Sequence, residues 1–287
     1  MYRFRSIGLI AKSDDDGQVA ETLGVIHRYL VERGLDISLD RSTDPVLHID
    51  GTVPRREIAE HCDLAIVVGG DGTLLTAARS LVDAGIPIVG VNLGRLGFLV
   101  DVSPDTMVDR LDEILRGDYA EEHRFLVQAD ILRGGGVRQR AVALNDVVLR
   151  IKNVVRMIEF ETWINGQFVN IQRADGMVVS TPTGSTAYAL SGGGPILHPA
   201  LDALLLLPIC PHTLSSRPIV VDADSDIEIR IREDIRETAQ VVSDGQNNID
   251  VAAGDRLRIR RKERKIRLLH PADYDYYHIL REKLHWG

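Results

Sequence analysis

The sequence predicts an α/β domain followed by an all-β domain, and three observations lead to this fold class. The chain has 287 residues, enough for two domains that each bury a core of their own. Up to about residue 122, short apolar runs alternate with segments of helical spacing, which is typical of a doubly wound α/β domain. After that point the spacing changes to a two-residue alternation, which predicts strands in a sandwich-like arrangement. We therefore expect an α/β domain over 1–122, a β-rich domain over 123–270, and a helix over 271–287 that packs back on the first domain.

The elements of the first domain can be assigned one by one. Residues 64–68, LAIVV, form an uninterrupted apolar run, as expected of a parallel strand covered on both faces. Residues 73–81 follow with an apolar stripe at helical spacing. The Ser-Pro pair at 103–104 resembles an N-cap and a proline at the first helical position, so we expect a helix that begins there and ends at Gly117. The remaining expected elements are strands over 7–10, 35–39 and 86–91, and helices over 19–33 and from residue 54.

The second domain is expected to consist of strands and turns. Residues 156–166, 218–232 and 255–269 alternate apolar and polar side chains and contain turn residues between the alternating runs. The tail, 273–286, returns to helical spacing. Together these segments predict a layered β domain followed by one helix.

Composition and charge indicate a globular protein and argue against some classes of partner. Hydrophobic residues make up 44% of the chain and charged residues 26%, as in ordinary globular proteins. The net charge of −8 argues against nucleic acid or an anionic membrane as a partner. The longest apolar run, 203–210, is short and contains Pro208, and the amino terminus lacks the pattern of a signal peptide. Only two cysteines occur, far apart, so we expect a reducing, cytoplasmic setting.

A glycine-rich turn, GGDGT, follows the strand over 64–68, where open α/β sheets bind ligands. A tight turn with Asp71 as a helix cap would explain one glycine and the aspartate, but not three glycines. Glycines let backbone N–H groups approach an anion, and a helix N-terminus favours negative charge. A carboxylate at such a site has a task beside a phosphoryl group: to accept the proton of an attacking hydroxyl or to hold a metal. The phosphate-binding candidates are Gly69, Gly70, Gly72 and Thr73, and the catalytic candidate is Asp71.

The other common phosphate-binding patterns do not occur. The chain has no G-x-x-x-x-G-K-[ST] loop, and the glycines of GVNLGRLGF at 90–98 have the wrong spacing for the dinucleotide fingerprint. A dinucleotide, if bound, is therefore held by another arrangement.

A second dense motif, ADGMVVSTPTGSTAYALSGGG, spans residues 174–194. It can be interpreted as a strand, a proline-containing turn and the start of a helix. Seven hydroxyl side chains nevertheless fall between Ser180 and Ser191, with almost no charge beside them. Such a set suits a purine and a ribose better than a bare phosphate. No G-x-S-x-G elbow is present, which disfavours serine hydrolase chemistry.

A third motif, ALNDVVLR, spans residues 143–150. Asn145 and Asp146 could form only a bulge or a turn in a strand. The same pair could hold a base edge and a ribose diol, because a carboxylate accepts hydrogen bonds from two hydroxyls.

At these motifs the sequence resembles the NAD kinase family. GGDGT, LNDVVL, DGMVVSTPTGSTAY with SGGGPILHP, and VSDGQ at 242–246 occur in the family's order and approximate spacing. GGDGT alone is shared with diacylglycerol and sphingoid kinases, whereas its combination with STPTGSTAY is far more specific. The resemblance covers essentially the whole chain and implies ATP-dependent phosphorylation of NAD⁺ to NADP⁺.

The resemblance also implies roles for matching positions. Asp71 would lie against the 2′-hydroxyl of the adenosine ribose and accept its proton. Asn145 and Asp146 would bind the adenosine part, and Asp175 and Ser191 would face the nicotinamide end, completed by a neighbouring subunit. The adenine side would be lined by Phe98, Thr183, Thr186, Ala187 and Tyr188, and the full set implied to bind NAD⁺ adds Gly72, Arg173 and Gln246.

One position departs from the family pattern. The second motif of the family commonly carries Asn-Glu, whereas this chain has Asn145-Asp146. Asp146 is one methylene shorter than the family's glutamate and so reaches less far toward the ribose. No dedicated metal cage is evident, so Mg²⁺ is expected to arrive with ATP. The family also implies a homo-oligomer, a dimer or a tetramer.

Two other functions fit parts of the sequence. A lipid kinase of the diacylglycerol or sphingoid type would keep Asp71 in the same role, but it would need an apolar channel where 174–191 is rich in hydroxyls. A dinucleotide sensor without turnover would have little use for Asp71.

Several polar residues carry no assignment from sequence. Most of the stretch RIRRKERKIR at 258–267 is explained by a solvated strand face, and the alternatives are nucleic-acid binding and, ahead of it, a contribution to the field around the ATP phosphates. Arg173 fits a substrate contact or a structural salt bridge. His198, His212 and His270 lie beside prolines, and no pair of them has zinc spacing.

Overall fold

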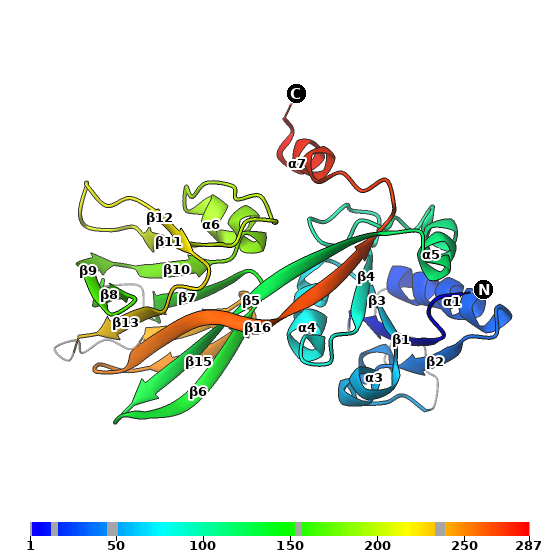
Figure 1. The fold of residues 1–287 in the computed structure, drawn as a ribbon, viewed down its shortest axis with the longest axis horizontal. Coiled ribbons are helices and arrows are strands. Elements are labelled where there is room, and N and C mark those ends of the chain that lie inside the picture. Colours follow the sequence, from blue (N-terminus) through cyan, green and yellow to red (C-terminus); the bar gives the residue numbers. More distant parts are fainter. Residues whose placement is uncertain (1, 13–16, 45–50, 153–156, 233–238, 287) are drawn as a thin grey trace. The chain divides into compact units, whose positions relative to one another are not determined.

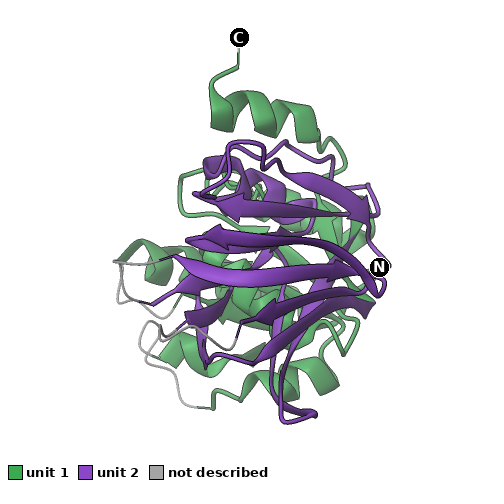
Figure 2. Ribbon diagram, turned by 90° about the vertical axis from the view of Figure 1, so that its left-hand side faces the viewer, with its two compact units in different colours: residues 1–123, 264–287 green, residues 124–263 purple. Residues whose placement is uncertain are grey.

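A computed structural model gives the structure of the protein and describes residues 2–12, 17–44, 51–152, 157–232 and 239–286. The chain divides into two compact units, which are coloured separately in Figure 2. Unit 1 contains Met1–His123 and Arg264–Gly287, and unit 2 contains Arg124–Glu263. Strands β5 (Ala120–Arg133) and β16 (Arg256–His270) continue from one unit into the other.

The sheet of unit 1 is parallel and buried. Its strand order is β2-β1-β3-β4-β16, with every neighbouring pair parallel (Figure 1). All five residues of β3 and of β4 are buried, as their uninterrupted apolar runs predict. The strands other than β16 are β1 (Ser6–Ala11), β2 (Asp36–Leu39), β3 (Leu64–Val68) and β4 (Pro87–Val91).

Helices cover both faces of this sheet. Apolar residues of α1 (Gly17–Glu32) and α5 (Met107–Arg116) share one core with alternate residues of β1, β3 and β4. On the opposite face, a side chain at Gly8 of β1 would meet Ile58, and one at Gly90 of β4 would meet Leu74. Ile58 and Leu74 belong to α3 (Arg55–His61) and α4 (Asp71–Leu81), so the doubly wound α/β domain expected from the sequence is confirmed.

Two helix starts differ from the expectation. Helix α4 begins at Asp71, two residues before the expected start at 73, with Gly70 as its N-cap. Helix α5 begins at Met107 instead of at the Ser-Pro pair, because residues 103–106 form a turn in which Thr106 N donates to Ser103 O. Its end at Gly117 is confirmed, and the φ of +99° there suits glycine.

The carboxyl-terminal segment belongs to unit 1. Helix α7 (Tyr276–Leu284) has Asp275 as its N-cap, whose side chain accepts a hydrogen bond from Tyr277 N. Lys283 of this helix donates a hydrogen bond of 2.6 Å to Leu96 O. The expectation that the last helix packs back on the first domain is therefore confirmed. A short 3₁₀ helix, η1 (Arg41–Thr43), completes the helical elements of this unit that the structure describes.

Unit 2 consists of antiparallel strands in two layers. One layer has the order β12-β11-β10-β7-β14-β15. The other contains β16, β13, β8 and β9, together with β5 and β6. The strands not yet bounded are β6 (Gly136–Ala143), β7 (Asp146–Ile151), β8 (Ile158–Ile164), β9 (Gln167–Ala174), β10 (Gly176–Ser180), β11 (Ala203–Ile209), β12 (Ile219–Asp222), β13 (Ile227–Ile231), β14 (Ala239–Ser243) and β15 (Asn247–Val251).

Alternation along the strands builds two apolar layers in unit 2. Val147 and Leu149 of β7 point into the main core, which also contains Phe160 of β8 and Ile229 of β13 from the other layer. This shared core confirms the sandwich-like domain. Val148 of β7 points the opposite way, into a smaller cluster that covers the outer face of the six-stranded layer. The other members of this smaller cluster are Val178, Ala189, Leu197, Leu205, Leu207 and Val242.

Within the described residues, no helix is long and apolar enough to cross a membrane. The apolar run at 203–210 is largely strand β11, whose central residues are buried.

Candidate functional site

In unit 1, the Asp71 carboxylate is held by a loop that follows strand β4. Phe98 N donates to Asp71 Oδ2 and Leu99 N donates to Asp71 Oδ1, each at 3.0 Å. A Cβ added at Gly97 would lie 2.2 Å from Asp71 Oδ1, so the loop can approach the carboxylate only with glycine at this position. Asp71 is thus not the helix cap that the simpler interpretation of the turn proposed. It is the first residue of α4, and its carboxylate is fixed by two N–H groups from elsewhere in the chain.

The GGDGT turn itself is tightly packed. A Cβ added at Gly69, where φ is +152°, would lie 2.6 Å from Thr73 Oγ1. Gly69 N donates to Val91 O at 2.9 Å, and Thr73 N donates to Gly70 O at 3.0 Å. The N–H groups of Gly69 and Thr73, two of the four phosphate-binding candidates, are thus engaged in backbone hydrogen bonds.

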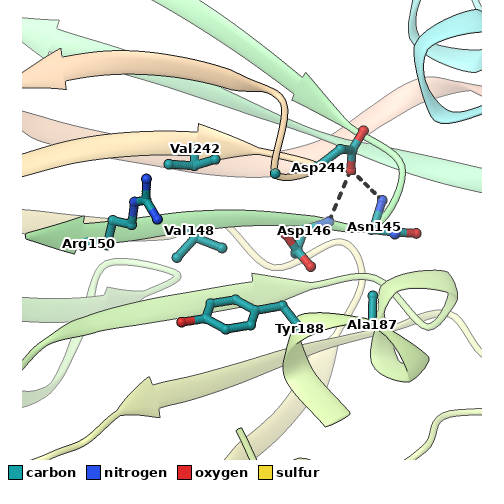
Figure 3. A pocket seen from close by; sticks show the side chains of 9 residues that line it. Asn145, Asp146, Val148, Arg150, Ala187, Tyr188, Val242 and Asp244 are labelled. Carbon is teal, nitrogen blue, oxygen red and sulfur yellow. Dashed lines mark hydrogen bonds between the residues drawn. The ribbon is translucent and has the colours of Figure 1, made fainter. Parts of the chain in front are cut away.

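In unit 2, a cavity of about 340 Å³ opens on the outer face of the six-stranded layer. Figure 3 shows Asp146, Val148 and Arg150 along β7, with Tyr188 and Ala187 on the facing segment. Four residues that the family resemblance singled out meet here, namely Asn145, Asp146, Ala187 and Tyr188. The full lining consists of Asn145, Asp146, Val148, Arg150, Ala187, Tyr188, Val242, Asp244 and Gly245.

Asp244 fixes the start of strand β7, which lines this cavity. Its carboxylate accepts hydrogen bonds from the N–H groups of Leu144 (3.1 Å), Asn145 (2.8 Å) and Asp146 (3.3 Å). Asp244 lies in the turn after β14, with a φ of +50°, and its side chain is buried. The sequence analysis quoted VSDGQ but selected only Gln246 from it. The available signal was an aspartate directly before a turn glycine.

The environment of Asp146 changes its acidity. Burial, and then the negative charge of Asp244, raises the pKa of Asp146 to about 7. Asp146 is 3% exposed. This carboxyl group therefore changes its charge within the neutral pH range, and it can donate a hydrogen bond as well as accept one.

The segment that carries Tyr188 packs directly against the backbone of Asn145. A Cβ added at Gly184, in the 3₁₀ helix η2 (Thr183–Thr186), would lie 2.2 Å from Asn145 O. Thr181 Oγ1 donates to Leu144 O at 2.5 Å. Tyr188 begins the short helix α6 (Tyr188–Ser191). Glycine at 184 and the Thr181 hydroxyl thus bring α6 and β7 together around the cavity.

Most hydroxyls of the STPTGSTAY motif stabilise this segment. Ser185 Oγ donates to Pro182 O at 2.6 Å and accepts from Leu197 N at 2.9 Å. Thr186 Oγ1 donates to Thr183 O at 3.3 Å, and Thr183 Oγ1 accepts from Arg124 at 3.2 Å. Among the seven hydroxyl residues, only Tyr188 lines the cavity. The hydroxyl-rich composition therefore reflects the internal bonding of the turn more than a set of ligand donors.

The remaining sequence candidates in unit 2 lie outside the lining of this cavity. Arg173 Nε is 3.7 Å from Glu159 Oε2, which favours the structural salt bridge among its two interpretations. Asp175 lies between β9 and β10, where its N–H donates to Ile209 O. Ser191 and Gln246 are exposed.

The arginines of β16 pair with carboxylates of their own unit. Arg260 lies 3.0 Å from Asp130, and Arg258 pairs with Asp226. In the described ranges, no group of three or more His, Cys, Asp and Glu side chains has the arrangement of a metal site. The arginines of this strand thus form ion pairs with carboxylates of neighbouring segments.

Comparisons with known proteins extend over both units. Residues 7–119 match the family described as the ATP-NAD kinase N-terminal domain, and residues 144–270 match the ATP-NAD kinase C-terminal domain. NAD kinase of Nitrosococcus oceani is 51% identical over 99% of this chain and 97% of its own length. NAD kinase of Pseudomonas entomophila is 48% identical over 100% of this chain and 97% of its own length.

Two solved structures share the fold. The crystal structure of an NAD kinase from Archaeoglobus fulgidus in complex with ATP superposes with a TM-score of 0.78 at 25% identity, over 98% of this chain and 100% of that chain. The crystal structure of yeast NADH kinase complexed with NADH gives a TM-score of 0.87 at 24% identity, over 99% of this chain and 88% of that chain. At that identity the second likeness concerns the fold alone.

Proposed function

The chain belongs to the NAD kinase family and phosphorylates the 2′-hydroxyl of the adenosine ribose of NAD⁺ with ATP, giving NADP⁺ and ADP, and we propose here which residues carry out this reaction. The assignment rests above all on one observation: an NAD kinase is 51% identical to this chain over 99% of its length. The roles of single residues follow from the geometry of each unit.

We propose that Asp71 accepts the proton of the attacking hydroxyl. A free aspartate has a pKa of about 3.9, so it cannot remove the proton of a ribose hydroxyl in advance. It can orient the hydroxyl and take the proton while the ribose oxygen bonds to the γ-phosphorus and the bond to ADP breaks. The two N–H groups that hold its carboxylate fix the orientation that this transfer needs.

For the phosphate groups of ATP, we propose contacts with the backbone of residues 70–72 at the start of α4. The partial positive charge of a helix N-terminus favours phosphate there. Gly69 and Thr73 are left to shape the turn, because their N–H groups already donate within the backbone. Mg²⁺ is proposed to arrive as the ATP complex and to neutralise the phosphate charge.

For NAD⁺, we propose that the unit 2 cavity takes the adenosine part. Asp146 would accept hydrogen bonds from the ribose diol, Asn145 would bind beside it, and Tyr188 and Ala187 would pack against adenine. The mixture of one aromatic ring, apolar strand residues and a buried carboxyl supports a nucleoside ligand. Roles for the other sequence candidates rest on their motifs alone: Gly72, Phe98, Arg173, Asp175, Thr183, Thr186, Ser191 and Gln246.

A homo-oligomer and a cytoplasmic location also remain proposals. The family resemblance supports a dimer or a tetramer, and sedimentation of the purified protein would distinguish these from a monomer. Cys62 is buried and Cys210 is exposed, both as free thiols, which fits a reducing compartment.

The test is a product assay with matched variants. Purified protein is incubated with NAD⁺, ATP and Mg²⁺, and NADP⁺ is quantified by chromatography for the wild type, Asp71→Asn and Asp83→Asn. Asp83 is an exposed aspartate beyond the other end of α4, so its variant controls for the loss of one charge. We expect at least a 100-fold lower kcat for Asp71→Asn only, about the contribution of a positioned base. Equal NADP⁺ formation by Asp71→Asn would remove Asp71 as the proton acceptor, and NAD⁺ binding without any NADP⁺ from the wild type would favour a sensor.

A further inference from the structure

The loop that holds Asp71 is itself held by the carboxyl-terminal segment. We define the Asp71 loop as residues 92–102, which leave β4 and return to it, with Asn92 N donating to Val102 O at 2.9 Å. Within the loop, Gly97 N donates to Val100 O at 3.0 Å. Residues 98 and 99 lie between these bonds and donate to Asp71. The position of the Asp71 carboxylate therefore depends on the position of this loop.

Near its return to β4, the Asp71 loop contacts the buried side chain of His270 through Asp101. Asp101 Oδ2 lies 3.0 Å from His270 Nδ1, and Glu122 Oε2 lies 3.2 Å from His270 Nε2. The His270 side chain is 2% exposed and stacks on Tyr274, with ring centroids 4.0 Å apart. Asp101 Oδ1 is buried and has no hydrogen-bond partner among the described residues, so the contact with His270 is the main attachment of this carboxylate.

The two carboxylates beside His270 change the acidity of its imidazole. Burial alone would lower the pKa of His270, but the hydrogen bond with Asp101 and the nearby negative charges of Asp101 and Glu122 raise the pKa above its ordinary value. The groups that face the imidazole are Asp101 from the loop, Glu122 from β5, and Tyr274 from the segment before α7. The two carboxylates therefore favour the protonated form of the imidazole that lies between them.

The other side of the loop is held from helix α7. Lys283 Nζ donates to Leu96 O at 2.6 Å and lies 5.6 Å from the centre of the Phe98 ring. The carboxyl-terminal segment thus touches the loop on both sides of the residues that donate to Asp71.

We infer that His270 and Lys283 are positioning residues for Asp71, acting through the Asp71 loop. This inference builds on the proposed role of Asp71 in phosphoryl transfer. Asp101 is only two residues from Leu99, so a change at Asp101 is passed along a short stretch of backbone to the N–H that holds Asp71. Misplacement of a reacting group by about 1 Å can reduce a rate about 100-fold. Neither residue needs to touch a substrate to have this effect.

The test compares His270→Gln and Lys283→Met with His278→Gln and Arg281→Met. His278 and Arg281 are exposed residues of α7, so the latter two variants control for substitution in the same segment. Lys283 is also exposed, so Lys283→Met should fold normally even if His270→Gln folds poorly. We expect about 10- to 100-fold lower kcat for the two test variants, with the KM for ATP and for NAD⁺ within about twofold of the wild type.

Two further readouts separate positioning from a general structural role. In an Asp71→Asn background, the test substitutions should no longer lower the residual kcat, because the group that they position is gone. Hydrogen–deuterium exchange of the peptide that contains Phe98 and Leu99 should become about tenfold faster in both test variants and stay unchanged in the controls. Exchange needs no turnover, so it tests the inference even if the wild type forms no NADP⁺, which would instead contradict the proposed function. Unchanged exchange at Phe98 and Leu99, or an equal loss of kcat in the Asp71→Asn background, would overturn the inference.

Discussion

At the scale of single residues, three carboxyl groups differ in their hydrogen-bond partners. Asp71 accepts two backbone N–H groups of one loop. Asp244 accepts three from the entrance of β7. Asp146 has no such donors to its carboxyl group among the described residues, and the nearby charge of Asp244 adds to its burial. Burial without such donors, next to the negative charge of Asp244, accounts for the raised pKa of Asp146.

The raised pKa of Asp146 predicts a pH-dependent affinity for NAD⁺. A pKa of about 7 means that the group is mostly protonated at pH 6 and mostly a carboxylate at pH 8. Because two ribose hydroxyls donate best to a carboxylate, the KM for NAD⁺ should fall by up to about tenfold from pH 6 to pH 8. Steady-state kinetics over this range measure the effect, and Asp146→Asn should show a flat KM. The same pH dependence in Asp146→Asn would assign the titration to another group.

His270 predicts the opposite dependence for stability. Its folded pKa lies above the ordinary value of about 6.5, so its contribution is complete below pH 6.5 and is lost as pH rises through the folded pKa. His270→Gln should therefore lower the free energy of unfolding more at pH 6 than at pH 9.5. Urea unfolding at the two values measures this difference, with His278→Gln as the control. A gap that widens toward pH 9.5 would contradict the charged state of His270.

At the scale of elements, the sequence predicts those whose pattern is local. The strand at 64–68 and the helix end at Gly117 depend on neighbouring residues only. Strand β11 is apolar without alternation because both its faces are buried, and periodicity cannot separate such a run from a buried helix. The start of α5 was wrong because Pro104 fits a turn as well as a first helical position.

The candidate site, like the elements, could be predicted from the sequence only where its pattern is local. The motifs pointed to Asp71, Asn145 and Asp146 as candidates, but not to the residues that they bond to. Asp244 bonds to Asn145 across 99 positions of sequence, and Asp71 bonds to Phe98 across 27. Contacts of this kind come from the packing of distant segments, which no single stretch of sequence encodes.

The contact between η2 and β7 predicts a specific effect of Gly184→Ala. The new methyl group would lie 2.2 Å from Asn145 O and 2.5 Å from Asn145 C, and backbone atoms of a buried strand entrance cannot move aside. We expect a loss of about 2–3 kcal/mol in the free energy of unfolding and a severalfold higher KM for NAD⁺.

The matched control is Gly24→Ala in the middle of α1. A side chain at Gly24 meets nothing within 4 Å, so this variant should gain about 0.5–1 kcal/mol from helix propensity. Denaturant unfolding and NAD⁺ kinetics measure both variants. An unchanged KM and stability in Gly184→Ala would show that η2 can move away from β7 without consequence.

At the scale of the whole molecule, the most basic stretch of the chain lies beside acidic side chains. The chain carries a net charge of −8, and four arginines of the basic stretch at 258–267 pair with carboxylates. Its described carboxylate partners are Asp226, Asp130, Asp202, Asp224 and Glu121.

These pairs predict no affinity for nucleic acid. Binding to DNA requires cations that can replace the counterions of phosphate, and paired arginines on an acidic protein do not supply them. The protein at about 10 µM should therefore leave the mobility of a DNA duplex unchanged even at about 50 mM salt, where electrostatic binding is strongest. A mobility shift that disappears on mutating Arg258 and Arg260 would contradict this prediction.

The division of unit 1 between the two ends of the sequence has a consequence for its synthesis. Strand β16 pairs with β4 through Arg267 and Leu268, and both residues leave the ribosome only when nearly the whole chain has been made. Until then β4 is an open sheet edge with five apolar or small residues, which invites pairing with another chain. A chain that stops shortly before residue 264 would contain all of unit 2 and yet leave the GGDGT half unfinished. The amino-terminal half of this kinase is thus the last part that can be completed.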